Sequence, residues 1–267
     1  MIFDIREYKS SDIPALTHLW CDVFGDSEAL VKRFFELLPS MGTGFVAYLD
    51  KHIYGAAYAL DAFLHLPDGE TKKLIYIYAV AVREDARGSG MGAELSRACM
   101  RYAWESLNDI CCTLPAEPSL YAWYKSRCGL KAVGGCRYET IKAGAMLDGI
   151  RRLHADEYSF LREDKLKGLP HASFGYGYML FQEAIFAELG GGFFEYNGGI
   201  ACGYVEDGIL RIKEALGDSP EFIAALCKML GAGSAEVRRA APDGGNYMAV
   251  YRAEDYPSDT VFNITLD

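Results

Sequence analysis

The residues best suited to chemistry form the hexapeptide Arg87-Gly88-Ser89-Gly90-Met91-Gly92, which follows an apolar run at residues 74–82 and precedes an amphipathic stretch. A glycine-rich turn between a strand and a helix presents unpaired backbone N–H groups and the positive end of the helix dipole to one point. Glycine also lacks the Cβ atom that would keep an anion at a distance. The hexapeptide therefore predicts a cradle for a phosphate or pyrophosphate.

The spacing of these glycines argues against two common nucleotide-binding motifs. A Walker A loop needs Lys-Ser or Lys-Thr directly after its glycines, and neither follows here. A dinucleotide-binding fingerprint needs G-x-G-x-x-G and an acidic residue near the end of the next strand, whereas Asp109 precedes that strand. A P-loop NTPase is excluded, and dinucleotide binding is disfavoured.

The hexapeptide resembles the acyl-CoA loop of the GNAT superfamily of N-acyltransferases, whose pattern (Q/R)-x-x-G-x-(G/A) it satisfies at every fixed position. The family usually has a valine five residues before the first position, and Val82 stands there. Residues 120–134 (LYAWYKSRCGLKAVG) are similar to the family's late helix-turn-strand segment. The chain is thus identified by resemblance as a GNAT protein.

The resemblance implies acetyl-CoA as co-substrate and a gap between the fourth and fifth strands that holds its pantetheine arm. The backbone of the fourth strand would then hydrogen-bond to that arm, and a backbone N–H would stabilise the oxyanion formed at the thioester. The residues expected to bind the co-substrate are Val80, Val82, Arg87, Gly88, Ser89, Gly90, Met91 and Gly92.

The resemblance also implies a tyrosine that protonates the leaving thiolate, and Tyr124 is the best match. Its distance from Gly129 is one residue longer than the family spacing, and Tyr121, one helical turn earlier, is the rival. The general base is left open because the fourth strand carries no glutamate. Ordered water could remove the proton along a route lined by tyrosines, namely Tyr54, Tyr58, Tyr76 and Tyr78. A carboxylate at Asp267 is a further option.

The expected function is N-acetyl transfer from acetyl-CoA to a primary amine of a small molecule or peptide, by direct transfer in a ternary complex. One alternative is a non-catalytic acyl-CoA sensor or regulatory module. Transfer from aminoacyl-tRNA is another, but it would want a basic groove. The 27 basic and 37 acidic residues give a net charge of −10, so no nucleic-acid partner is expected.

The pattern of apolar residues predicts alternating strands and helices, and the resemblance of their order to the GNAT fold implies an α/β protein with a mixed, mainly antiparallel twisted sheet flanked by helices. In the first half, strands are expected at 2–8, 44–49, 53–60, 74–82, 110–114, 130–133 and 136–142, and helices near 14–24, 28–38, 91–107 and 118–127. In the second half, a charged helix precedes strands at 193–196, 200–205 and 209–215, a helix after Ser219 and Pro220, and strands at 235–240 and 247–252.

The second half repeats the order of elements of the first, which predicts two GNAT-like domains, 1–145 and 146–267. The second carries Gly217-Asp218-Ser219-Pro220 where the phosphate loop would stand, so we expect a degenerate domain that binds no CoA there. The first part contains 18 acidic and 16 basic residues and the second 19 and 11, which places most of the negative charge in the second. That charge would suit a cationic acceptor.

The eight cysteines include no CxxC pair, which favours reduced core thiols in a cytoplasmic protein. Inert burial is favoured for Cys111 and Cys112, which fall on the predicted fifth strand near the thioester site. The five histidines show no metal-ligand spacing, so no metal site is expected. No apolar run approaches the roughly 20 residues that cross a bilayer. We expect no membrane association, and a homodimer is possible.

Overall fold

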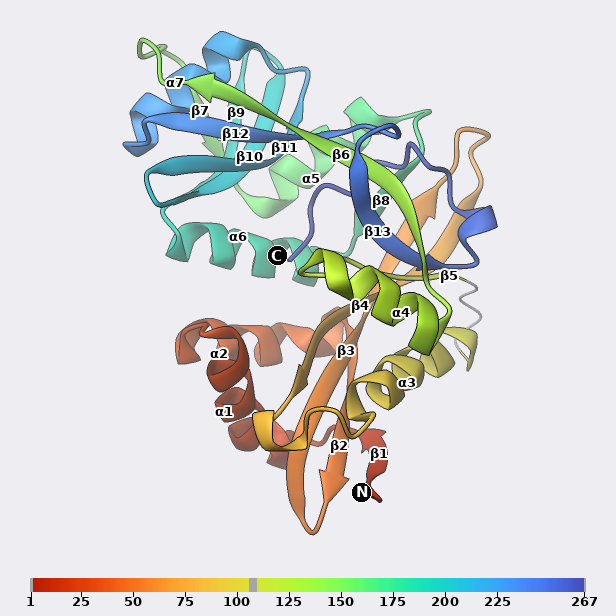
Figure 1. Ribbon diagram of the computed structural model, residues 1–267. Coiled ribbons are helices and arrows are strands. Elements are labelled where there is room, and N and C mark those ends of the chain that lie inside the picture. Colours follow the sequence, from red (N-terminus) through yellow and green to blue (C-terminus); the bar gives the residue numbers. More distant parts are fainter. Residues whose placement is uncertain (1, 106–109, 267) are drawn as a thin grey trace.

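The structure is a computed structural model that describes residues 2–105 and 110–266, and one twisted sheet runs through both halves of the chain (Figure 1). Within these residues the sheet has 13 strands, in the order β1-β2-β3-β4-β5-β13-β6-β12-β11-β10-β9-β7, with β8 paired to β3. Only the pairs β4–β5 and β11–β12 are parallel. The predicted fold class, a mixed and mainly antiparallel sheet flanked by helices, is confirmed.

The first half supplies β1 (Asp4–Glu7), α1 (Ile13–Phe24), α2 (Glu28–Leu37), β2 (Gly42–Leu49), β3 (His52–His65), β4 (Thr71–Val82), α3 (Met91–Glu105), β5 (Ile110–Thr113), α4 (Pro118–Cys128) and β6 (Lys131–Lys142). Local sequence accounts for several boundaries. Pro14 lies in the first turn of α1, and the Ser27 hydroxyl caps α2 by accepting from the N–H of Leu30.

The second half supplies β7 (Arg151–Leu153), α5 (Ala155–Leu166), β8 (His171–Phe174), α6 (Tyr176–Glu188), β9 (Gly192–Tyr196), β10 (Gly199–Glu206), β11 (Ile209–Leu216), α7 (Pro220–Leu230), β12 (Ser234–Ala240) and β13 (Gly245–Tyr251). The parallel unit β11-α7-β12 repeats the unit β4-α3-β5 of the first half. This repetition supports the proposed duplication.

The two halves exchange strands. β13, from the end of the chain, lies between β5 and β6, and it is antiparallel to both. β6 in turn pairs along seven residues with β12 of the second half. Figure 1 shows β6 as a long strand that leaves the lower part of the molecule and reaches the upper part. Because each half completes the sheet of the other, we expect the halves to fold together.

Each face of the first half of the sheet has its own core. Alternate residues of β4 point to opposite faces: Leu74 and Tyr76 pack with α1 and α2, and Ile75 and Ile77 pack with α3 and α4. The first of these cores continues into the second half, where Phe181 of α6 meets Phe34 of α2 with ring centroids 5.1 Å apart. The halves are thus joined by packing as well as by strands.

Several elements differ from expectation. The strands predicted at 130–133 and 136–142 form the single strand β6, bent at Gly134 with a φ of 68°. β7, β8 and α6 were not predicted. The final described residues, 260–266, are buried apart from the partly exposed Val261, which forms an isolated bridge with His171. The end of the helix predicted to reach residue 107 lies outside the described residues.

In the part of the chain that the structure describes, no helix is both long enough and apolar enough to cross a membrane.

Candidate active site

The centre of the site is the point where β4 and β5 separate. Their parallel ladder covers three residue pairs and ends at Tyr76 and Cys112, although β4 continues to Val82. At the fork, the Thr113 hydroxyl donates to the backbone carbonyl of Ile77 at 2.9 Å. Beyond that point the backbone of β4 from Ile77 to Val80 borders a cavity.

A bulge in β4 lies beside this fork. Ala79 has a φ of 47°, and the register between β3 and β4 shifts there, so Ala79 and Val80 stand opposite the single residue Ala57. The shift reverses the alternation of side chains, because Ile77 and Val80 both pack toward the face covered by α3. A bulge of this kind turns backbone groups of β4 away from the neighbouring strand, β3, and toward the cavity.

The predicted phosphate loop connects a short 3-10 turn (Glu84–Ala86) to α3. Gly88 and Gly90 have φ values of 78° and 91°, and nothing lies within 4 Å of a Cβ placed on either. The Arg87 guanidinium donates from Nε to the carbonyl of Val82 at 3.3 Å, and the Ser89 hydroxyl donates to the carbonyl of Ala86 at 2.6 Å. These contacts fix the loop.

The helix that follows begins at Met91, whose side chain is buried, and the face of Gly92 lies against the ring of Trp123. The first N–H groups of a helix have no partner within it. Here the N–H groups of Ala93 and Glu94 donate to the carbonyl of Gly90 at 3.1 and 3.2 Å, so the backbone that can face a pyrophosphate beside the end of β4 is that of residues 90–92.

The two candidate tyrosines have different surroundings. Tyr124 is 6% exposed, lies at the cavity, and interacts with the hydroxyls of Thr113 and Ser96. Burial raises the pKa of Tyr124 to about 12, against the opposing effect of these hydrogen bonds. Tyr121 donates its hydroxyl to the backbone carbonyls of Asn246 and Tyr247 in β13, each at 3.0 Å. Both tyrosines line the cavity, but the Tyr121 hydroxyl is engaged by the backbone of β13, whereas the Tyr124 hydroxyl interacts with the side chains of Thr113 and Ser96.

The cavity measures about 950 Å³ and is built by both halves of the chain. The first half contributes β4, Tyr124 and the segment from Thr113 to Pro118, and the second half contributes residues from α6, β10 and β13. The described acidic residues along its wall are Asp26, Glu117, Glu188 and Glu206. The aromatic residues along it include Trp20, Tyr76, Tyr78, Tyr138 and Tyr204.

Two charged groups of the wall are held by neighbours. The Trp20 indole donates to Asp26 at 2.7 Å. Arg238 donates to the Tyr247 hydroxyl at 2.6 Å and to the Thr265 hydroxyl at 2.9 Å, so its guanidinium is bound within the protein. The exposed carboxylates of Glu117 and Glu188 give the open part of the wall a negative charge, whereas the carboxylate of Glu206 is paired with Arg211 at 3.3 Å.

Other predicted site residues are placed as follows. Tyr76 and Tyr78 line the cavity, but Tyr58 is buried in the core against Phe34, and Tyr54 packs on the opposite face with Arg83 over its ring at 4.3 Å. The predicted water route along all four tyrosines is therefore wrong for Tyr54 and Tyr58, which do not line the cavity. Asp267 lies outside the described residues.

The cysteines of the fifth strand are inert. Cys111 and Cys112 are buried, and burial raises the pKa of Cys111 to about 12 and that of Cys112 well above its ordinary value. All eight cysteines of the chain are free thiols, as predicted.

Comparison with known proteins defines the class. Residues 4–125 match the model of the acetyltransferase (GNAT) domain family, whereas no curated protein matches the sequence. This part of the chain is a GNAT domain, and the resemblance carried by the hexapeptide is confirmed.

Solved structures share the fold of nearly the whole chain. A protein from Enterococcus faecalis described as a probable N-acyltransferase is 13% identical with a TM-score of 0.73, over 94% of this chain and 72% of that one. A GCN5-related N-acetyltransferase from Kribbella flavida is 15% identical with a TM-score of 0.66, over 95% and 73%. One from Anabaena variabilis is 14% identical with a TM-score of 0.65, over 94% and 73%. At these identities the likeness shows the fold alone.

The wall contributed by the second half could not be predicted from the sequence. Glu188 and Tyr204 belong to α6 and β10, and no motif marks them. The one available signal was the excess of acidic residues after residue 145.

Proposed function

We propose that the chain is an acetyl-CoA-dependent N-acetyltransferase that acts on a primary amine. The observation that carries the proposal is the alignment of three features: the positive-φ loop from Arg87 to Gly92, the free backbone edge of β4, and the buried phenol of Tyr124. The loop suits the pyrophosphate of acetyl-CoA, and the β4 edge, which includes Val80 and ends at Val82, suits the amide groups of its pantetheine arm.

In the proposed reaction the amine nitrogen attacks the thioester carbonyl carbon, and the C–S bond then breaks. A backbone N–H at the β4 bulge stabilises the oxyanion formed at the carbonyl. Tyr124 donates its proton to the departing sulfur, and its raised pKa keeps that proton on the phenol at neutral pH. The ammonium nitrogen loses one proton to water at the open side of the cavity before it attacks. It loses a second proton as the amide forms, and this proton restores the Tyr124 phenol.

The cavity wall supports a cationic acceptor. The exposed carboxylates of Glu117 and Glu188 attract an ammonium group, and the aromatic ring of Tyr78 at the cavity favours a cation further. The acceptor class proposed is therefore a primary amine on a positively charged small molecule or peptide.

The second domain, which we place at 146–267, is proposed to complete this acceptor site rather than to bind CoA. At its equivalent loop, the Ser219 hydroxyl caps α7 by accepting from Phe222 N–H at 3.2 Å. Asp218 forms a two-point ion pair with Arg239 at 2.7 and 2.8 Å. The loop is thus filled by its own contacts, and a carboxylate stands where an anion would bind.

The experiment is a thiol-release screen with acetyl-CoA against polyamines, aminoglycosides, amino acids and peptide N-termini. Turnover with any amine class supports the proposal. Binding of CoA in calorimetry together with no thiol release across the panel would instead support an acyl-CoA sensor. Failure to bind CoA would overturn both.

Replacing Gly90 with valine is expected to raise the KM for acetyl-CoA at least about tenfold, because a side chain would stand in the anion cradle. Its φ of 91° adds backbone strain of about 1–2 kcal/mol. Gly149→Val is the matched control, since Gly149 has a φ of 90° and equally open surroundings but lies outside the site. Similar KM values for the two variants would contradict the role of the loop.

Replacing Glu188 with glutamine is expected to raise the KM for a cationic amine about threefold to tenfold and to leave the KM for acetyl-CoA unchanged. The effect shrinks at high salt, because Glu188 is exposed. Asp164→Asn removes the same charge from an exposed position on α5 and serves as the control. Equal effects of the two variants would show that the general charge of the second half, and not the cavity wall, attracts the amine.

A further inference from the structure

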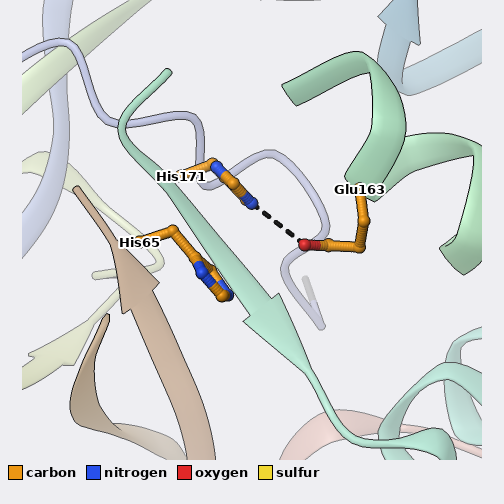
Figure 2. Close-up of side chains that lie close together, drawn as sticks. All are labelled: His65, Glu163 and His171. Carbon is orange, nitrogen blue, oxygen red and sulfur yellow. Dashed lines mark hydrogen bonds and ion pairs between the residues drawn. The ribbon is translucent and has the colours of Figure 1, made fainter. Parts of the chain in front are cut away.

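Figure 2 shows a cluster of His65, Glu163 and His171. None of the three lines the cavity of the proposed reaction. His65 of β3 and His171 of β8 are directly opposite in an antiparallel ladder, and their rings stack with centroids 4.6 Å apart and planes at 12°. Glu163 approaches from α5, with Oε2 3.0 Å from His171 Nε2. One candidate ligand atom of each residue lies within 4.8 Å of the other two.

We propose that His65, Glu163 and His171 form a binding site for a divalent transition-metal ion of the zinc class. Two imidazoles and one carboxylate are a ligand set that zinc accepts, with a water molecule at its fourth position. Magnesium and calcium prefer all-oxygen sites, so the two imidazoles select against them.

The hydrogen bonds of His171 orient it as a ligand. Its Nδ1 lies 2.8 Å from the backbone carbonyl of Leu169, and a carbonyl can only accept. Nδ1 therefore carries a proton, and in the neutral ring the lone pair of Nε2 points at the Glu163 carboxylate. An unprotonated Nε2 and the carboxylate oxygen Oε2 are both acceptors, so their separation of 3.0 Å requires either a proton on Nε2 or a metal ion that binds both atoms. Metal binding would displace that proton.

The other two residues are held for the same task. The second carboxylate oxygen of Glu163 accepts from Arg162 Nη1 at 3.0 Å, which leaves Oε2 for the cluster. The two ring nitrogens of His65 lie 2.7 Å from the Ser173 hydroxyl and 3.2 Å from the Thr71 hydroxyl. Whichever nitrogen binds the ion, the other keeps a hydroxyl partner that fixes the ring.

The cluster is also accessible. It borders a pocket of about 200 Å³, which leaves room for an ion and a water molecule. The neighbouring Lys167 is exposed and can turn toward solvent. His171 is 4% exposed, while His65 and Glu163 are half-buried, so one ligand is anchored in the fold and two face the entry.

The position of the site gives the ion a structural role. His65 belongs to the first half of the chain, and the other two ligands belong to the second half. An ion bound to all three would clip α5 and β8 to the end of β3. Because the unfolded chain cannot assemble this triad, the ion would stabilise the folded state.

The test uses the full chain without a polyhistidine tag, stripped with a chelator, equilibrated with Zn²⁺ and freed of excess ion by gel filtration. We expect about one bound zinc per chain by elemental analysis, and a melting temperature about 5 °C higher when free zinc is roughly 100-fold above its dissociation constant. Co²⁺ in place of zinc should give the visible bands of a site with nitrogen ligands.

E163Q, which preserves shape and removes the charge, should lose the bound zinc and the thermal shift, as should H171A. H18A is the control, because His18 forms an exposed pair with Asp22 at 3.3 Å and lies outside the cluster. Equal zinc binding by the wild-type chain and E163Q, or no binding by the wild-type chain, would overturn the proposal. Since E163Q leaves both imidazoles in place, it is the decisive variant if H171A does not fold. The acetyl-transfer assay is not needed for any of these readouts.

Discussion

Tyr124→Phe is expected to lower kcat about 100-fold while the KM for acetyl-CoA changes little, because only the transition state uses the phenolic proton. The ring itself stays, so the packing of α4 against the ring of Trp123, with centroids 4.8 Å apart, is preserved. The measurement is thiol release at saturating acetyl-CoA, with the amine that the screen identifies.

Tyr121→Phe is the matched control, since it removes the same atom one helical turn away. It loses the hydrogen bonds to Asn246 and Tyr247 and should cost about 1 kcal/mol of stability, with kcat within about threefold of the wild type. Unchanged turnover in Tyr124→Phe would remove Tyr124 from the mechanism. A large loss in Tyr121→Phe alone would assign the proton to the rival.

The same proton predicts a pH dependence. The pKa of Tyr124 is raised to about 12, so the acid form, which is the active form, persists as the pH rises through 9. We therefore expect no fall in kcat from loss of this proton up to about pH 9. A decline below that value that disappears in Tyr124→Phe would contradict the assignment.

Local sequence was sufficient to predict the elements that we propose to hold acetyl-CoA. The apolar run at 74–82 is a strand buried on both faces, and the glycines after it occupy the positive-φ turn that their lack of a Cβ atom allows. The helix that carries Tyr124 could be predicted because α4 has a proline at its start and Gly129 at its end, whereas Tyr124 itself was selected by resemblance to the family. These signals depend on neighbours in the sequence.

Elements fixed by distant contacts could not be predicted. α6 was missed because apolar residues surround its axis, from Tyr178 and Met179 to Phe181 and Phe186, so no amphipathic period is visible. The position of β13 between β5 and β6 depends on pairing across more than a hundred residues, to which periodicity is blind. The acceptor wall and the histidine cluster are assembled by the same distant contacts.

The largest expected loss of stability comes from a buried ion pair that joins α5 to β11. Arg162 and Glu214 are 2% and 0% exposed, with Nε 2.8 Å from Oε1 and Nη2 3.3 Å from Oε2. The Tyr158 hydroxyl also donates to Glu214 at 3.0 Å, and Arg162 donates to the carbonyl of Ala172 at 2.8 Å. Glu214→Ala would leave the guanidinium charged, buried and without its main partner.

We expect Glu214→Ala to lower the free energy of unfolding by about 3–5 kcal/mol, measured by urea denaturation followed by circular dichroism. Glu36→Ala is the control: its pair with Arg33 has a similar contact distance, 3.0 Å against 2.8 Å, but side chains 65% and 43% exposed, and should cost less than about 1 kcal/mol. Replacing both buried partners, Arg162→Met with Glu214→Leu, should be less harmful than Glu214→Ala alone, because it removes the uncompensated charge. Equal losses in Glu214→Ala and Glu36→Ala would show that water reaches the pair.

Because Arg162 also positions Glu163, the double variant should weaken zinc binding at the proposed site of His65, Glu163 and His171 even where stability recovers. Measuring both stability and zinc binding in this variant separates the contribution of the Arg162–Glu214 pair to stability from the role of Arg162 in orienting Glu163.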